Sequence, residues 1–119
     1  TVSFCHQFDY PFIRALRMRE GLDPAKMTCG YKPSGGFLFD AWHAEQYGGT
    51  GAVFDWSRLP IVRDYPLILA GGLNCENVAL AVRSVFPDMV DVSGGVESAP
   101  GIKDPALVEK FIRNAKRVT

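Results

Sequence analysis

The sequence has little of what would direct a chain to nucleic acid, to a membrane or to an oxidising compartment. Lys and Arg number 13 and Asp and Glu number 13, so the formal net charge is zero and no basic field is available to attract nucleic acid or anionic lipid. No apolar run approaches the ~20 residues of a spanning helix, and no signal-peptide pattern is present. The three cysteines, Cys5, Cys29 and Cys75, are scattered, which does not fit a disulfide framework or a zinc site. We therefore expect a cytoplasmic protein without a metal.

The chain also lacks a methionine at its start, which reads Thr1, Val2, Ser3. Its 119 residues match a single domain, for which about 100–150 residues are typical. We expect one domain and interpret the chain as a processed or truncated piece.

Short apolar runs alternate with helix-like segments about four times. The expected strands are residues 11–18, 36–41, 67–70 and 89–93, and the expected helices are residues 23–31, 55–59, a third beginning at Asn74 and a fourth beginning at Asp104. The residues expected to be buried by the last two helices are Val78, Ala81, Val82 and Val85, then Leu107, Val108, Phe111, Ile112 and Ala115. Nearly continuous apolar strands are typical of a parallel sheet covered by helices.

Glycine turns follow the third and fourth expected strands. They contain Gly71 and Gly72 in the first turn, and Ser93, Gly94 and Gly95 in the second. Ligands in such folds gather at the carboxyl ends of strands. A turn without Cβ atoms lets an anion approach the backbone N–H groups, and a helix beginning after Asn74 would add its positive dipole end. Two such turns on consecutive strands predict a phosphate site.

Two carboxylates lie near the same expected edge. Asp40 ends the second strand and is a candidate catalytic group, although an aspartate at a strand end is more often a solvated or turn-capping residue. Asp91 lies in an apolar strand, where a carboxylate is costly unless hydrogen-bonded, and it could simply hold the adjacent loop. A single Gly-Gly sequence after a strand, such as Gly71 and Gly72, is more often a tight turn than a phosphate site. Glu97, Lys103 and Asp104 could form a helix-capping set of charges.

Four motifs together resemble the phosphoribosylanthranilate isomerase family. They are FLFDA ending at Asp40, YGGTGAVFDWS at residues 47–57, ILAGGLNCENV at 68–78 and VDVSGGVESAPGIKD at 90–104. The resemblance implies an α/β fold of the (β/α)8 TIM barrel family, which takes ~200 residues or more. Residues 1–119 would then be the C-terminal half, a half barrel with strands five to eight, and the first half would be absent.

The resemblance also implies an enzyme of tryptophan biosynthesis. It would convert N-(5-phosphoribosyl)anthranilate into 1-(2-carboxyphenylamino)-1-deoxyribulose 5-phosphate by an Amadori rearrangement, using general acid and base groups with no cofactor and no metal. The implied catalytic acid is Asp40. The implied phosphate-binding residues are Gly71, Gly72, Ser93, Gly94 and Gly95, and the residues near the substrate are Gly49, Thr50, Gly51 and Asp91. Gly94 departs from the family, which usually has a second serine there.

The family's general base, a cysteine on the first strand, and its substrate-binding arginine on the second strand fall outside this chain. Cys5 precedes strand five in a helical stretch and cannot replace that base. We therefore expect the isolated chain to be inactive and to self-associate through open sheet edges. Its expected partner is a small sugar phosphate, with no nucleic acid and no membrane.

Two alternatives remain open from the sequence. One is a non-catalytic phosphate-binding half-barrel, flavodoxin-like or a dimer of halves. The other is a different sugar-phosphate barrel, such as indole-glycerol-phosphate synthase or a pentose-phosphate epimerase, whose families match GGTGAVFDWS less well.

Overall fold

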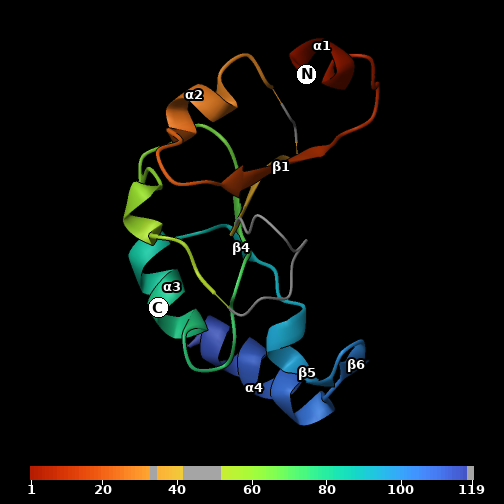
Figure 1. Cartoon of the computed structure of the whole chain (residues 1–119), viewed down its shortest axis with the longest axis vertical. Coiled ribbons are helices and arrows are strands. Elements are labelled where there is room, and N and C mark those ends of the chain that lie inside the picture. Colours follow the sequence, from red (N-terminus) through yellow and green to blue (C-terminus); the bar gives the residue numbers. More distant parts are fainter. Residues whose placement is uncertain (33–34, 42–51, 118–119) are drawn as a thin grey trace.

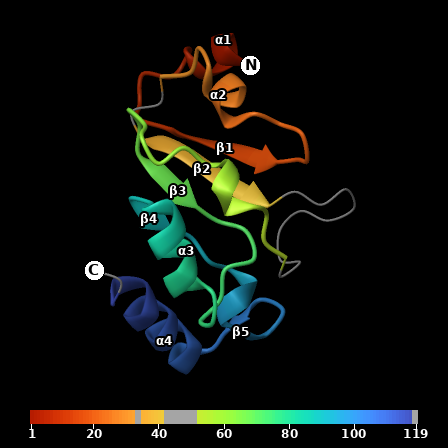
Figure 2. The ribbon, with the colours of Figure 1, turned by 90° about the vertical axis from the view of Figure 1, so that its left-hand side faces the viewer.

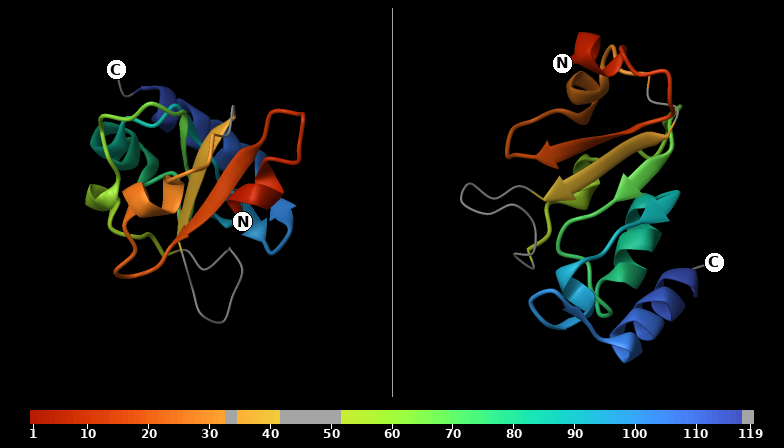
Figure 3. Two further views of the ribbon diagram at one scale, coloured as in Figure 1. Left: turned by 90° about the horizontal axis from the view of Figure 1, so that it is seen from above. Right: turned by 90° about the vertical axis from the view of Figure 1, so that its right-hand side faces the viewer.

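The molecule in Figure 1 is built around a sheet of four parallel strands, which Figure 2 shows in chain order. The strands are β1 (Ile13–Met18), β2 (Gly36–Ala41), β3 (Leu67–Leu69) and β4 (Met89–Val90). The computed structural model describes residues 1–32, 35–41 and 52–117. Because the strands are parallel, their carboxyl ends meet at one edge, toward which the arrows of β1 to β3 point in Figure 3. The expected parallel α/β sheet is confirmed.

The strands are connected by helices and short helical turns. These are α1 (Val2–Cys5), α2 (Pro24–Thr28), the 3-10 helix η1 (Trp56–Arg58), α3 (Val78–Val85), the 3-10 helix η2 (Gly94–Val96) and α4 (Pro105–Lys116). Asp23 caps α2 by accepting from the Ala25 N–H at 3.0 Å, and Asp104 caps α4 by accepting from the Ala106 N–H at 2.9 Å. Each aspartate precedes a proline, whose missing N–H costs nothing in the first turn. The described part of the chain has no helix both long and apolar enough to cross a membrane.

The core lies on one face of the sheet. Alternate strand residues enter it, namely Leu16, Met18, Phe37, Phe39, Leu67 and Leu69, together with Val78, Ala81 and Val85 of α3 and Phe111 of α4. Figure 2 shows α3 packed across the sheet, with α1 and α2 beside β1 and α4 beyond β4. On the opposite face, the intervening residues of β1 and β2, such as Arg17, Leu38 and Asp40, are only half-buried. The expected helix cover is therefore seen on one face of the sheet.

The sequence predictions for the fourth strand, for the second helix and for the burial of Ile112 are wrong. The fourth strand ends at Val90 instead of residue 93, so Asp91 lies exposed just beyond it rather than inside the strand. The helix expected at 55–59 is only the 3-10 helix η1, although Asp55 does cap it. Ile112 is 47 % exposed, because it lies at the border of the α4 face that Phe111 buries.

A two-stranded hairpin was not predicted from the sequence. β5 (Glu97–Ala99) and β6 (Ile102–Lys103) pair antiparallel between η2 and α4. The hairpin lies on the side to which the arrows of β1 to β3 point (Figure 3). Strands this short lack the alternation that would distinguish them from a loop.

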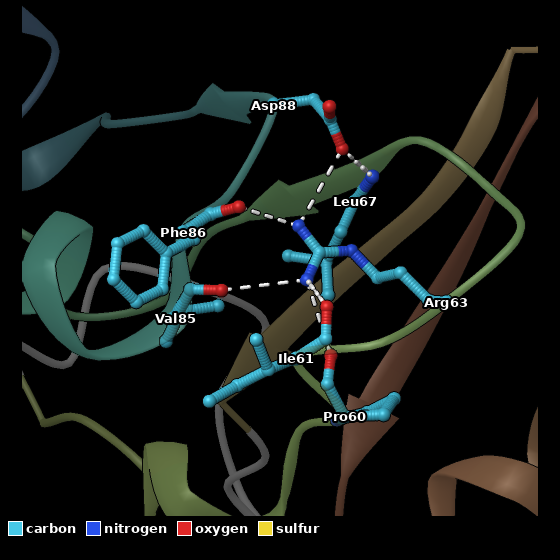
Figure 4. A network of polar contacts seen from close by, with 7 residues as sticks. All are labelled: Pro60, Ile61, Arg63, Leu67, Val85, Phe86 and Asp88. Carbon is cyan, nitrogen blue, oxygen red and sulfur yellow. Dashed lines mark hydrogen bonds and ion pairs between the residues drawn. The ribbon is translucent and has the colours of Figure 1, made fainter.

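An arginine clamp holds the amino-terminal edge of the sheet together (Figure 4). The Arg63 side chain is only 8 % exposed and donates to four carbonyl oxygens, those of Pro60, Ile61, Val85 and Phe86, at 2.5–3.4 Å. Its guanidinium lies 3.6 Å from the Asp88 carboxylate, which in turn accepts from the Leu67 N–H at 2.8 Å. One side chain thus joins the segment before β3 to the end of α3 and the start of β4.

Replacing Arg63 by Met should lower the free energy of unfolding by roughly 2–4 kcal/mol, because several carbonyls would lose their donor in a place largely closed to water. Urea denaturation measures this. The control is Arg83→Met, which removes the same charge from an exposed position on α3 and should change stability by less than about 0.5 kcal/mol. Equal losses in the two variants would contradict the role of the clamp.

Candidate active site

A cleft of about 540 Å³ opens at the carboxyl ends of the strands. It is lined by Asp40 of β2 and by the loops after β3 and β4. These loops contribute Gly71, Gly72, Leu73 and Asn74, then Asp91, Val92, Ser93, Gly94 and Gly95, and the hairpin contributes Glu97, Ser98 and Ala99. Every described residue that we predicted from the sequence to belong to the site therefore lines one cleft. Gly49, Thr50 and Gly51 lie outside the described residues.

Asp40 reaches the cleft because it is the next-to-last residue of β2 and belongs to the face turned away from the core. It is half-buried and lies opposite Arg17 of β1 in the strand register. Gly71, at the end of the neighbouring strand, packs directly against it. A Cβ atom added at Gly71 would lie 2.7 Å from Asp40 Oδ1 and would collide with the backbone nitrogen of Ala41.

The absent side chains of the site glycines allow backbone segments to pack closely. From the sequence, we had expected them to make room for an anion. The Cβ direction of Gly72 is filled by the Ala52 carbonyl, and that of Gly95 by the Leu73 carbonyl. At these positions, as at Gly71, the absent side chain therefore makes room for protein and not for a ligand. Gly71 and Gly72 also have φ values of +87° and +69°, which side chains rarely tolerate.

The N–H groups of these turns nevertheless suit an anion. In the described part of the chain, none of the N–H groups of Gly71, Gly72, Gly94 and Gly95 donates to a protein acceptor. Backbone donors are almost always satisfied by protein, water or ligand. Four such donors around one cleft form a suitable surface for phosphate oxygens.

The helix after the first glycine turn begins later than expected. Asn74 accepts from the N–H groups of Glu76 and Asn77, both at 2.9 Å, but it caps a turn, and α3 itself begins at Val78. Asn77 binds back to the loop, since its side-chain amide donates to the Gly72 carbonyl at 2.9 Å. The two asparagines therefore brace the glycine turn, and the helix end lies farther from Gly72 than predicted.

The loop after β4 is braced by an ion pair whose role the sequence did not reveal. Lys103 Nζ lies 2.6 Å from Glu97 Oε1 and donates to the Ser93 carbonyl oxygen at 2.9 Å. The Lys103 hydrogen bond, followed by one from the Gly101 N–H, holds the pKa of Glu97 below its ordinary value. Only Asp104 of the expected charge set caps a helix. A Pro-Gly turn between an acidic and a basic residue, in ESAPGIK, was the signal available for this pair.

The chain returning from β2 is tied to the loop after β1. Arg58 of η1 donates to the carbonyl oxygens of Arg19, at 2.7 Å, and Leu22. Asp55 accepts from the Ser57 hydroxyl and N–H, and these bonds lower the pKa of Asp55. These contacts fix the segment whose Ala52 carbonyl packs against Gly72.

None of the described cysteines lies on the cleft. Cys5 is buried on α1, Cys29 is exposed, and Cys75 is buried with its thiol 3.3 Å from the Leu107 carbonyl oxygen. His6 is exposed beside α1. The site as described thus contains two aspartates and a glutamate but no thiol or imidazole.

A parallel sheet with its cleft at the carboxyl strand ends defines an α/β protein, the class that includes the TIM-barrel-like folds. The sequence model of N-(5'phosphoribosyl)anthranilate (PRA) isomerase matches residues 4–114, so the chain belongs to this family. The resemblance inferred from the four motifs is confirmed.

Similar proteins carry the same name. The N-(5'-phosphoribosyl)anthranilate isomerase of Chromohalobacter salexigens is 50% identical over 108 residues, which cover 91% of this chain and 51% of that protein. The Neisseria gonorrhoeae protein is 46% identical over 117 residues, 98% of this chain and 56% of that protein. The chain thus spans about half the length of the curated relatives that it matches.

Solved structures agree with the fold. The isomerase of Thermotoga maritima superimposes with a TM-score of 0.77 at 34% identity, covering 98% of this chain and 58% of that one. Another structure of the family contains reduced 1-(o-carboxyphenylamino)-1-deoxyribulose 5-phosphate and superimposes with a TM-score of 0.71 at 30% identity, covering 98% of this chain and 55% of that one.

Gly71→Ala should lower the free energy of unfolding by roughly 3 kcal/mol or more, because the new methyl group meets Ala41 and Asp40 in addition to the strain of a positive φ. Gly21→Ala is the matched control. Gly21 has a φ of +77° and nothing within 4 Å of an added Cβ, so it should cost only about 1 kcal/mol. Urea denaturation of both variants separates the two effects, and equal losses would show that the close packing at Gly71 is not needed.

Proposed function

We propose that this chain forms the phosphate-binding and acid-bearing side of a phosphoribosylanthranilate isomerase active site. The observation that carries the proposal is the convergence of the Asp40 carboxyl and the four donor N–H groups on one cleft. The ligand in the related solved structure has a 5-phosphate and an arylamino sugar, the two parts such a cleft would receive. The product would enter tryptophan biosynthesis.

In the proposed reaction, the sugar phosphate is held by the N–H groups of Gly71, Gly72, Gly94 and Gly95, with Ser93 and Asp91 nearby. Asp40 donates a proton to the furanose ring oxygen, and the ring C1–O bond breaks as the anthranilate nitrogen lone pair forms an iminium. A base then removes the C2 proton, which gives an enolamine that tautomerises to the ketone. The reaction is redox-neutral within the substrate.

We further propose that residues 1–119 correspond to strands five to eight of a (β/α)8 barrel. Among the described strands, β1 and β4 each have one unpaired edge. An apolar groove of about 520 Å³ lies beside β4, between it and α4. Together with the half-buried inner face of β1 and β2, these features support a sheet that continues on both sides. Without such a continuation, we expect the free edges to pair between copies of the chain.

Asp40→Asn in the natural full-length protein should lower kcat at least about 100-fold, the usual contribution of a general acid, while leaving KM within about threefold. Asp64→Asn is the control, since it removes one exposed carboxylate that precedes β3 at the other edge of the sheet. The rate of conversion is measured as the decrease in the fluorescence of phosphoribosylanthranilate. A kcat unchanged in Asp40→Asn would remove Asp40 from the mechanism but leave the phosphate site intact.

The 119-residue chain alone should not isomerise phosphoribosylanthranilate, because the proposed base is supplied by a strand that it does not contain. Inorganic phosphate should still bind to it if the chain is folded. Turnover by the purified chain above the uncatalysed rate would contradict the assignment of the base. Phosphate binding without turnover by the natural full-length protein would favour the non-catalytic alternative.

A further inference from the structure

The hairpin after β4 places a lysine behind the phosphate-binding turn. β5 and β6 pair Glu97 with Lys103, and the Asp104 N–H donates to the Val96 carbonyl at 2.8 Å, so the chain returns to its starting point before α4 begins. Ser93 and Lys103 are ten positions apart in the chain, yet their side chains are 3.3 Å apart. Lys103 does not line the cleft, whereas Ser93 and Glu97 do.

The Lys103 ammonium group uses all three of its donors on this turn. It donates to the Ser93 carbonyl oxygen at 2.9 Å, to the Ser93 hydroxyl at 3.3 Å and to Glu97 Oε1 at 2.6 Å. The second carboxylate oxygen of Glu97 accepts from the Gly101 N–H at 3.2 Å. Glu97 is therefore bound at both oxygens and anchors Lys103 to the tip of the hairpin.

The contact to the Ser93 carbonyl matters because of the geometry of the peptide unit. The Ser93 C=O and the Gly94 N–H belong to one planar trans peptide, in which they point in opposite directions. Holding the oxygen therefore fixes the direction of the N–H. The internal bond of the turn, from the Val96 N–H to the same oxygen, is long at 3.4 Å and cannot fix it alone.

We infer that Lys103, anchored by Glu97, is a positioning residue that aims the Gly94 N–H into the cleft for the phosphate group of the substrate. This inference rests on the proposed function. It assigns a task to Gly94: a glycine has no side-chain donor, so its backbone N–H is the donor available at this position, and the orientation of that N–H depends on Lys103. The lysine acts from behind the turn and does not touch the phosphate.

The test measures the affinity of the natural full-length protein for inorganic phosphate by isothermal titration calorimetry, at low salt and at about 0.5 M NaCl, where charge effects beyond a few ångströms are screened. Lys103→Met should weaken binding roughly tenfold or more at both salt concentrations, as expected for the loss of a charge-assisted hydrogen bond. Lys103→Arg keeps donors for the carbonyl and should stay within about threefold of the unchanged protein.

Lys110→Met is the matched control. Lys110 lies on α4 in a single ion pair with Glu76, and its side chain is 53 % exposed, against 49 % for Lys103. The Lys110→Met substitution removes one positive charge, as Lys103→Met does, but at a position away from the cleft. It should change phosphate affinity by less than about twofold. Urea midpoints of both variants show whether Lys103→Met is folded. If Lys103→Met is not folded, Glu97→Gln replaces it in the test. This variant keeps an oxygen acceptor for Lys103 but loses the negative charge, and it should weaken phosphate binding about threefold.

A kinetic measurement separates positioning from chemistry. In the isomerase assay, Lys103→Met should raise KM and leave kcat within about twofold, because phosphate binding holds substrate and transition state alike. If Lys103→Met binds phosphate as tightly as Lys110→Met, the inference is overturned but the phosphate site is not. The same conclusion holds if Lys103→Met binds phosphate more weakly only at low salt. Failure of the unchanged protein to bind phosphate overturns the phosphate site and this inference together.

Discussion

The close approach of three successive strand ends is the constraint on which the site depends. Gly71 lies against the end of β2, Gly72 against the segment returning from β2, and Gly95 against the loop after β3. Each contact leaves no room for a Cβ atom. Because the loops pack backbone to backbone, Asp40 and both glycine turns line one cleft, and among the described residues the glycine N–H groups of these turns have no protein acceptor. A side chain at any of these glycines would force the loops around Asp40 and the two glycine turns apart.

The two edges of the sheet are stabilised in different ways. At the amino-terminal edge, the buried side chain of Arg63 satisfies carbonyl groups from two segments, residues 60–61 and 85–86. At the carboxyl-terminal edge, Asn74, Asn77 and Lys103 brace the turns with hydrogen bonds to the backbone while leaving N–H groups available. The contacts that hold the strands together thus lie at the opposite edge of the sheet from those that shape the cleft.

Residues with strong local signals were predicted well. The limits of β2, the cap at Asp104 and the parallel order of the sheet follow from apolar runs, from a capping side chain and from proline, all of which act over a few residues. The short elements were predicted poorly. β4 ends after two residues, and the hairpin of β5 and β6 was missed, because two- and three-residue strands are stabilised by contacts with the rest of the molecule and not by their own pattern.

The sequence by itself determined the family, since four motifs with fixed spacing identify it, and it determined which residues could form the site. Only the tertiary structure decided why those residues are needed. The sequence could not show that Gly71, Gly72 and Gly95 face protein backbone, since that depends on how loops from different strands approach one another. Nor could it show that Lys103 reaches the Ser93 carbonyl, because ten intervening residues must first fold back as a hairpin. Local chemistry is encoded within a few residues, whereas these contacts exist only once the chain has been brought together by its core.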